Sequence, residues 1–578
     1  MTGNKIIIGA AASLAVVVLA STIAFASSPK LSRDLHGEDP RATVDVIVQF
    51  KQMPADADHE KIRGKSGRVK MKLDSIKGGA YSVPASALAA LAADPDVAFI
   101  SADREVSGLL DVAAPAISAD LATAHGLDGA GVTIAVIDSG IHDSGDLQDS
   151  RGNSRVVLRH SAFKRAKGDP YGHGTHVAGV LAGNARKSSN DEAIRAFRGV
   201  APGASLASFQ VLSADGTGRT SAVIAAIERA IKLRDRYDIR VINLSVGHPV
   251  FESYREDPLC RAVEEAWKAG IVVVVAAGNY GREDSMGTGG YATITSPGNS
   301  PYVITVGAMK TRGTVARSDD EIASYSSKGP TAIDHVVKPD LVAPGNRTIS
   351  LQNPNASLAE QYPDNKVSRA YYSTRDPERI SQMYFTLSGT SMAAPMVSGA
   401  AALLIQQDAS LTPDQVKARL MKTASKTFPA SSETTDAETG ETFVSYYDIF
   451  TVGAGYLDVL AALANTDRFE GPALSPTATF DEAAGSVSIH ATGSVDGIKL
   501  ADGSLQGDSA IWGDSAVWGN SAVWGNSAVW GNSAVWGNSA AEGFSAIWGN
   551  SAIWGTSTVS DGTAVDATAT RTMIHGEE

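Results

Sequence analysis

"GVTIAVIDSG", residues 131–140, is an unbroken apolar run that ends on an acidic side chain followed by small residues. A strand that is apolar at every position suits a sheet covered on both faces, as parallel sheets are. Up to about residue 463, similar runs such as "IRVINLSVG", "IVVVVAAGN" and "YVITVGAM" alternate with segments of helical spacing. The pattern predicts repeated βα units, that is, an α/β fold with a parallel sheet and helices on both faces.

Three polar residues lie where such a sheet places its chemistry, beyond the carboxyl ends of its strands. Asp138 ends the first run, His173 lies in "YGHGTHVAGVLAG", and Ser391 lies in "LSGTSMAAPMVSG". A serine hydroxyl becomes a nucleophile when an imidazole takes its proton and a carboxylate orients the imidazole. The small residues after His173 and Ser391 predict helices that begin close to the sheet edge. We expect Pro395 in the first turn of the second helix, where proline is tolerated.

An attacked carbonyl also needs donors for its developing negative oxygen. Asn279 ends the run "VVVVAAGN" and can offer a side-chain amide, and the backbone N–H of Ser391 at a helix start can be the second donor. The alternative interpretation makes Asn279 an ordinary turn residue after Gly278.

Six motifs occur in a fixed order: "AVIDSGI", "GHGTHVAG", "VINLSVG", "AAGN", "KPDLVAPG" and "LSGTSMAAPMVSG". Over roughly residues 131–463 the chain therefore resembles the subtilisin-like serine proteases. Its Asp, His, Ser order is that of subtilisin, not of chymotrypsin or the α/β-hydrolases. The resemblance implies the triad Asp138, His173 and Ser391, with Asn279 in the oxyanion hole. "GTSMA" lacks the second glycine of a lipase or esterase, and a scaffold without activity is the remaining alternative.

The resemblance also implies a substrate cleft lined by two segments that pair with an extended peptide. The matching residues are Leu244, Ser245, Val246 and Gly247 in one segment, and Ala276, Ala277 and Gly278 in the other. Thr295 stands where many relatives have a glycine at the base of the first specificity pocket. A narrower pocket that prefers small or medium apolar side chains follows.

The chemistry of such a protease requires no cofactor. Residues 185–198 are longer than, and unlike, the asparagine-rich calcium loop of the bacterial subtilisins. We therefore assign no metal ligands, and structural calcium elsewhere stays open. Residues 346–383 are also longer than in the smallest relatives, which predicts either a surface loop or a rim over the site.

The N-terminus carries the marks of an export signal. Lys5 precedes an apolar run, and "AFA" at residues 24–26 fits a cleavage site, so residues 1–26 are predicted to be a signal peptide. The protein is then secreted or extracytoplasmic; the alternative is an N-terminal membrane anchor.

Residues 27–108 contain "TVDVIVQF", which alternates with period two, and a later strand, helix, strand pattern. This region resembles the inhibitory pro-domain of subtilisin-like proteases, a small α+β unit of ferredoxin-like fold. Such a unit would fill the cleft with its C-terminal tail until the enzyme cuts it off between about Glu105 and Ala114. The alternative is a permanent small domain of the mature protein.

The peptidase domain is assigned to residues 109–466 and is followed by a linker at 467–508. Residues 509–556 then repeat "SAVWGN" and close variants with a period of six, and hold seven of the eight tryptophans. Because six is a multiple of two, an extended chain places every tryptophan on one face, which favours a β-type repeat region. The repeats could pack on themselves, bind a cell wall or surface polymer, or form a flexible tail that continues through residues 557–578.

Composition excludes other classes of function. The net charge of -13, without a long basic block, argues against a nucleic-acid partner. Cys260 is the only cysteine, so no intramolecular disulfide can form, and its amphipathic segment predicts a small buried hydrophobe. The sequence thus predicts a secreted serine endopeptidase that acts on polypeptides through an acyl-enzyme. The alternative is a surface-attached binding protein whose repeats are the active part and whose protease domain only matures the chain.

Overall fold

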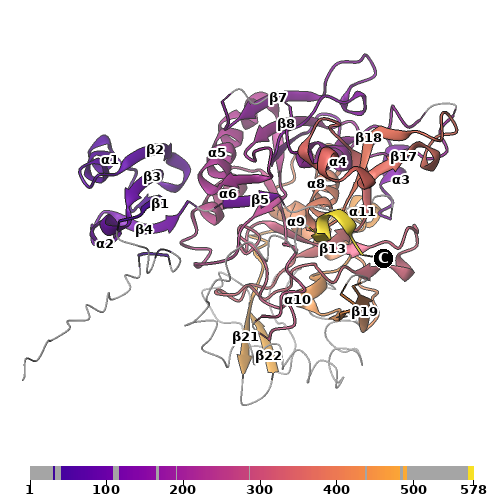
Figure 1. The fold of residues 1–578 in the computed structure, drawn as a ribbon. Helices are drawn as coiled ribbons and strands as arrows, with labels where there is room; N and C mark the ends of the chain where they lie inside the picture. Colours follow the sequence, from indigo (N-terminus) through magenta and orange to yellow (C-terminus); the bar gives the residue numbers. More distant parts are fainter. Residues whose placement is uncertain are drawn as a thin grey trace, which may run out of the picture.

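The computed structural model describes residues 30–32, 35, 41–103, 105–108, 116–164, 168–189, 192–285, 287–436, 439–481, 486–490 and 571–577. The predicted signal peptide and the tryptophan repeats lie outside these residues. A small N-terminal unit lies beside a larger domain, as Figure 1 shows.

The larger domain is built on an eight-stranded sheet. In spatial order its strands are β14 (Glu321–Ile322), β13 (Ile304–Lys310), β12 (Val272–Ala276), β10 (Ile239–Leu244), β6 (Thr133–Asp138), β8 (Ser205–Gln210) and β7 (Val156–Ser161), with β15 (Leu341–Pro344) paired to β13. β6 and β12 are buried at every residue, as their apolar runs predict. All pairs are parallel except β13 with β14. The predicted parallel sheet is thus mixed, because a short reversed strand covers its exposed edge.

Helices cover both faces of this sheet (Figure 1). α4 (His173–Ala182) and α8 (Thr390–Gln407) pack against each other on one face, and α5 (Thr220–Tyr237) and α6 (Pro258–Lys268) on the other. The shorter helices are α3 (Ala119–Ala124), α7 (Ser357–Gln361), α9 (Pro413–Thr423), α10 (Ile449–Val452) and α11 (Val459–Ala464). In α6, Cys260 is buried as predicted, and this burial raises the pKa of its thiol.

Pro395 is not in the first turn of its helix, as we expected, but inside α8. The helix begins earlier than the proline suggests, at Thr390. A proline at this position cannot donate a hydrogen bond to the carbonyl of Ser391, four residues before it. Ser245 replaces that donor, because its hydroxyl lies 2.8 Å from the Ser391 carbonyl oxygen.

The N-terminal unit follows the order β1 (Thr43–Phe50), α1 (Asp56–Arg63), β2 (Arg68–Leu73), β3 (Gly78–Pro84), α2 (Leu88–Ala92) and β4 (Val97–Ala102). Its four strands form an antiparallel sheet in the order β2-β3-β1-β4. Val48, Tyr81 and Ile100 lie in its own hydrophobic core. The unit therefore has a core of its own, while four of its buried side chains join the main cluster of the larger domain: Ile47, Leu73, Ile76 and Ala80.

This unit contacts the larger domain at the start of α5. Thr220 is the first residue of that helix, and the residue before it, Arg219, makes no side-chain cap bond. Instead the carboxylate of Asp103, from the N-terminal unit, accepts bonds from the Ser221 N–H at 2.8 Å and hydroxyl at 2.6 Å. A residue distant in sequence thus provides the acceptor that a cap residue would supply.

Residues 346–383 are neither a bare loop nor a separate unit. β16 (Thr348–Leu351), β17 (Lys366–Ser368) and β18 (Ile380–Leu387) form an antiparallel sheet in the order β16-β18-β17. The segment contacts the chain just before α4: Leu358 N–H donates to the Tyr171 carbonyl at 3.2 Å, and Asn353 Nδ2 to the Asp169 carbonyl at 2.6 Å. It therefore supports the start of α4, which carries His173.

Two hairpins complete the described chain, β19 (Ser431–Thr435) with β20 (Thr442–Tyr446), and β21 (Thr477–Asp481) with β22 (Ser486–His490). The segment before β21, where composition predicts a linker, contacts the domain: Ser475 is fully buried and its N–H donates to the Pro301 carbonyl at 2.9 Å. Among the described residues, no helix combines the length and the apolar composition that crossing a membrane requires.

Candidate active site

Asp138 and His173 form a buried pair. Asp138 is the last residue of β6 and His173 the first residue of α4. His173 Nδ1 lies 2.6 Å from Asp138 Oδ1, and neither side chain is exposed to solvent. The same oxygen accepts the Ser139 N–H at 2.7 Å, which fixes the carboxylate. With a proton on Nδ1 donated to Asp138, Nε2 of His173 is the atom that can accept a proton.

The start of α4 is held by a residue that the sequence analysis missed. The buried carboxylate of Asp169 accepts bonds from the Gly172 N–H at 2.8 Å and from the Thr175 N–H at 2.7 Å and hydroxyl at 2.6 Å. Burial raises the pKa of Asp169. An acidic residue just before a helix start is a recognisable signal, and here it fixes the turn that presents His173.

The second histidine of "GHGTHVAG" has a different environment. His176 is buried, and its Nε2 lies 3.0 Å from the Phe385 carbonyl and 3.2 Å from the Thr348 carbonyl. Burial lowers the pKa of His176 to about 3. A neutral ring whose Nε2–H donates to backbone carbonyls has a structural role.

Ser391 is the second residue of α8, next to the substrate segment. Its hydroxyl lies 3.4 Å from the Ser245 carbonyl, and the Ser245 hydroxyl bonds to the Ser391 carbonyl. Gly389, immediately before the helix, has φ of 124°, a conformation that favours glycine. This turn explains why small residues surround the serine: the helix must begin directly beneath it.

Asn279 follows β12 and points toward the same helix start. Its Oδ1 accepts the Thr390 N–H at 2.7 Å, which fixes the orientation of the amide. Thr390 Oγ1 in turn accepts the Gly278 N–H at 3.1 Å. The donor end of the Asn279 amide, Nδ2, is thereby turned away from Thr390. Asn279 is thus held by a hydrogen bond to the residue before Ser391.

A short strand pairs with the segment that we expect to bind substrate. β5 (Glu105–Gly108) lies between β11 (Val246–Gly247) and β9 (Thr217–Arg219), antiparallel to both. Gly108 is opposite Val246, and Ser107 is opposite Gly247. The predicted segment that follows Leu244 therefore pairs with an extended chain. Its counterpart, β9, was not predicted, because "TGR" is too short and glycine-rich to be read as a strand.

The second predicted segment makes different contacts. Ala277, which follows β12 and its last residue Ala276, donates its N–H to the Val306 carbonyl at 3.0 Å, and its carbonyl accepts the Thr295 N–H at 3.0 Å. β5 does not pair with it. Thr295 lies between both segments, because an added Cβ at Gly247 or Gly278 would meet its side chain at 2.9 Å. The Thr295 side chain thus packs against Gly247 of the first segment and Gly278 of the second.

Calcium is typical of many proteases of the resembled kind, so we tested the described residues for a site. Among them, no group of three or more His, Cys, Asp or Glu side chains converges as metal ligands would. The described side chains therefore do not fit a carboxylate-rich calcium site, and no step of the chemistry is assigned to a metal.

The comparisons with known proteins agree with this geometry. A family model described as the subtilase family matches residues 129–445. The chain belongs to the subtilase family. This subtilase is 37% identical over 393 residues to serine protease AprX of Bacillus subtilis, over 65% of this chain and 82% of that one. It is 32% identical over 394 residues to subtilisin E of the same species, over 65% of this chain and 84% of that one.

A solved structure supports the same fold. Fervidolysin from Fervidobacterium pennivorans, described as a keratinolytic enzyme related to subtilisin, aligns with a TM-score of 0.52 and 21% identity. The alignment covers 75% of this subtilase and 62% of that chain. Family membership makes this protein a serine endopeptidase that acts on peptides, as the sequence predicted.

Proposed function

We propose that this subtilase is an exported, self-maturing endopeptidase that works through Asp138, His173 and Ser391. His173 Nε2 takes the hydroxyl proton while Ser391 attacks the peptide carbonyl. Asp138 holds the ring in the required tautomer and stabilises its charged form. Asn279 Nδ2 and the Ser391 N–H stabilise the oxyanion. His173 then protonates the leaving amine, and water hydrolyses the acyl-enzyme.

The observation that carries this proposal is the buried hydrogen bond of 2.6 Å between His173 Nδ1 and Asp138. It assigns the tautomer, and so leaves Nε2 as the base. The orientation of Asn279 by Thr390 supports the oxyanion role independently, because it directs the amide donor before any substrate binds.

We also propose that the N-terminal unit, with β5, is an inhibitory pro-domain. Its contact at α5 and the pairing of β5 with β11 and β9 support this role. Gly108 is opposite Val246, and the carbonyl oxygen of the preceding residue, Ser245, lies 3.4 Å from the Ser391 hydroxyl. The proposed maturation cut is the bond between Leu109 and Leu110, within the interval predicted from the sequence. Export is supported by the N-terminal charge and apolar pattern of residues 1–26.

The test compares the chain from residue 27 onward with its Ser391→Ala variant. Gel mass, N-terminal sequencing and casein hydrolysis are measured for both. Only the parent should shorten, with a new N-terminus at Leu110, and only the parent should digest casein, with a loss on the order of a millionfold in the variant. A folded parent that neither shortens nor digests casein would refute the catalytic assignment.

The position of Thr295 supports a preference for small or medium apolar side chains before the cleaved bond. Replacing Thr295→Gly should widen the space between Gly247 and Gly278. We expect kcat/KM for a peptide with phenylalanine before the cleaved bond to rise at least tenfold relative to the alanine peptide. A parent that already cleaves the phenylalanine peptide much faster than alanine or leucine peptides would contradict the preference.

A further inference from the structure

The last described segment, residues 571–577, returns to the larger domain after the repeat region. Residues 571–575 are helical, and the segment contacts the domain extensively. Met573 is 3% exposed and Ile574 is 6% exposed, and both join the main hydrophobic core. Burial of two apolar side chains at a chain end indicates a bound segment, because a free tail has no such surface to cover.

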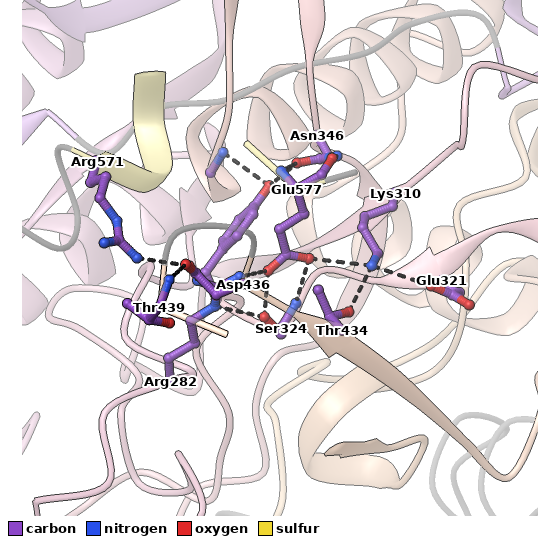
Figure 2. A network of polar contacts seen from close by, with 12 residues as sticks. Arg282, Lys310, Glu321, Ser324, Asn346, Thr434, Asp436, Thr439, Arg571 and Glu577 are labelled. Carbon is purple, nitrogen blue, oxygen red and sulfur yellow. Dashed lines mark hydrogen bonds and ion pairs between the residues drawn. The ribbon is translucent and has the colours of Figure 1, made fainter. Parts of the chain in front are cut away.

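The carboxylate of Glu577 lies in a buried polar site, shown in Figure 2. It accepts a bond from Arg282 Nη2 at 2.7 Å and from the Ser324 N–H at 3.1 Å, and also from the Ser324 hydroxyl. Lys310 Nζ lies 3.4 Å from Glu577 Oε2, the oxygen that also accepts the Ser324 N–H. Glu577 is 5% exposed and Lys310 is 1% exposed. Two cations and two neutral donors around one buried carboxylate form a built site, since a buried charge needs such partners.

The backbone of the segment is bound as well. Asn346 Nδ2 donates to the Glu577 carbonyl at 2.7 Å, and Asn346 Oδ1 accepts the Glu577 N–H at 2.9 Å. At the other end of the segment, Arg571 donates to Asp436 at 2.7 Å, and Asp436 also accepts from Arg282 at 2.7 Å. Figure 2 shows these groups as one connected network. The site thus recognises a peptide by its main chain and by both of its charged side chains.

The bound segment lies beside the catalytic residues. The Met573 carbonyl accepts the N–H of Ser388, three residues before Ser391, at 2.8 Å. The Tyr171 hydroxyl, two residues before His173, lies 3.8 Å from the Met573 sulfur. The segment therefore occupies a backbone donor of the loop that leads to Ser391.

β5 approaches the same serine from the segment that we expect to bind substrate. Its carboxyl end pairs with β11, next to Ser245, whose carbonyl oxygen lies 3.4 Å from the Ser391 hydroxyl, so a substrate bound in this direction continues past Ser391. Residues after the cleaved bond would then meet the surface that Met573 covers. Extended peptides bind by such main-chain donors, so the segment and a long substrate compete for one position.

We propose that residues 571–577 are an intramolecular peptide ligand, bound through Glu577 at the site of Arg282, Lys310 and Ser324, and that they cover the leaving-group side of the cleft. The position beside the nucleophile rests on the proposed catalytic role of Ser391. The docking itself rests only on the contacts of the segment. The site takes a short peptide that carries an acidic side chain at the position of Glu577.

The docking is tested by a binding measurement that needs no activity. The chain is ended at residue 570, carries Ser391→Ala, and is titrated into a fluorescein-labelled peptide of residues 571–578. Fluorescence anisotropy should show saturable binding, weakened at least tenfold by Glu577→Gln in the peptide. The matched change Glu578→Gln, one residue further on, should alter the affinity less than threefold. No binding, or equal loss for both changes, overturns the docking.

Coverage of the cleft is tested with the full chain and two substrates. In the first substrate, p-nitroaniline is the leaving group, so no residue follows the cleaved bond. The second is a fluorescence-quenched peptide with four residues after the cleaved bond. In the full chain, Glu577→Gln should lower KM for the long peptide at least threefold and leave the p-nitroanilide unchanged. Glu578→Gln should change neither. An unchanged KM in Glu577→Gln overturns the coverage.

A chain without its last eight residues gives the same comparison if Glu577→Gln does not fold. It should match the low KM of that variant, and the added peptide should restore the parent value. A parent that hydrolyses neither substrate refutes the catalytic proposal instead, and the anisotropy then decides the docking by itself.

Discussion

At the scale of single residues, the chemistry depends on where hydrogen bonds direct each polar group. Asn279 shows this most directly. Its Oδ1 accepts the Thr390 N–H, and this bond fixes the direction in which Nδ2 can donate. Asn279→Ala should lower kcat about a hundred- to a thousandfold, the loss known for an oxyanion-hole donor of a subtilisin. KM should change little. A loss spread equally over KM and kcat would contradict a role confined to the transition state.

His176 gives a pH prediction at the same scale. Burial lowers its pKa to about 3, whereas the unfolded chain takes up this proton near pH 6.5. The unfolded state therefore binds more protons between these values, and stability falls as pH falls through this window. In the Ser391→Ala background, the unfolding free energy is measured by urea titration at several pH values between 6 and 4. His176→Gln should reduce its slope against pH by up to about 1.4 kcal/mol per pH unit. Parallel curves for both chains would refute this.

At the scale of elements, the N-terminal unit is held by its bonds to helix α5. Asp103 is buried and binds two groups of Ser221, whereas Asp74 pairs with Lys232 only at 3.9 Å, with both side chains exposed. Buried charged bonds contribute more than exposed pairs. In the Ser391→Ala chain, Asp103→Ala should speed hydrogen exchange at the start of α5 at least tenfold. Asp74→Ala should change it less than twofold, and equal effects would count against the contact.

The element scale also shows which parts of the site were predictable. Asp138 ends an apolar strand, Asn279 follows another, and glycines precede His173 and Ser391, so the local pattern was enough to propose all four. β9 was missed because its role depends on pairing with β5, which is far away in sequence, whereas Asp169 was missed although its partners, Gly172 and Thr175, are close to it in the chain. Pro395 was placed wrongly, because the donor that replaces its missing N–H comes from Ser245.

At the scale of the whole molecule, distant segments meet in a buried cluster beneath the sheet. Asp340 lies 2.7 Å from Lys338 and 3.2 Å from Lys417. Ser475, in the segment predicted as a linker, donates to Asp340 at 2.5 Å and accepts from Lys417 at 2.9 Å. Ser475 therefore adds one hydrogen bond to each of two charged groups of the cluster when its segment is docked.

This cluster makes the docked segment part of the stability of the domain. In the Ser391→Ala background, Ser475→Ala should lower the unfolding free energy by about 1–3 kcal/mol, because it removes buried hydrogen bonds to two charged groups. The exposed Ser410→Ala, measured in the same urea titration, should cost less than about 0.5 kcal/mol. Equal small effects would show that the segment does not support the domain.

The sequence by itself determined the α/β class, the order of the strands that carry the site, and the triad and oxyanion candidates. It could do so because buried strands and tight turns leave a local record in apolar runs and glycines. Only the tertiary structure decided that β5 lies between β11 and β9, that Asp103 binds the start of α5, and that Glu577 docks beside the nucleophile loop. These contacts join segments far apart in sequence through single polar groups, and no periodicity of the chain records which partner such a group will find.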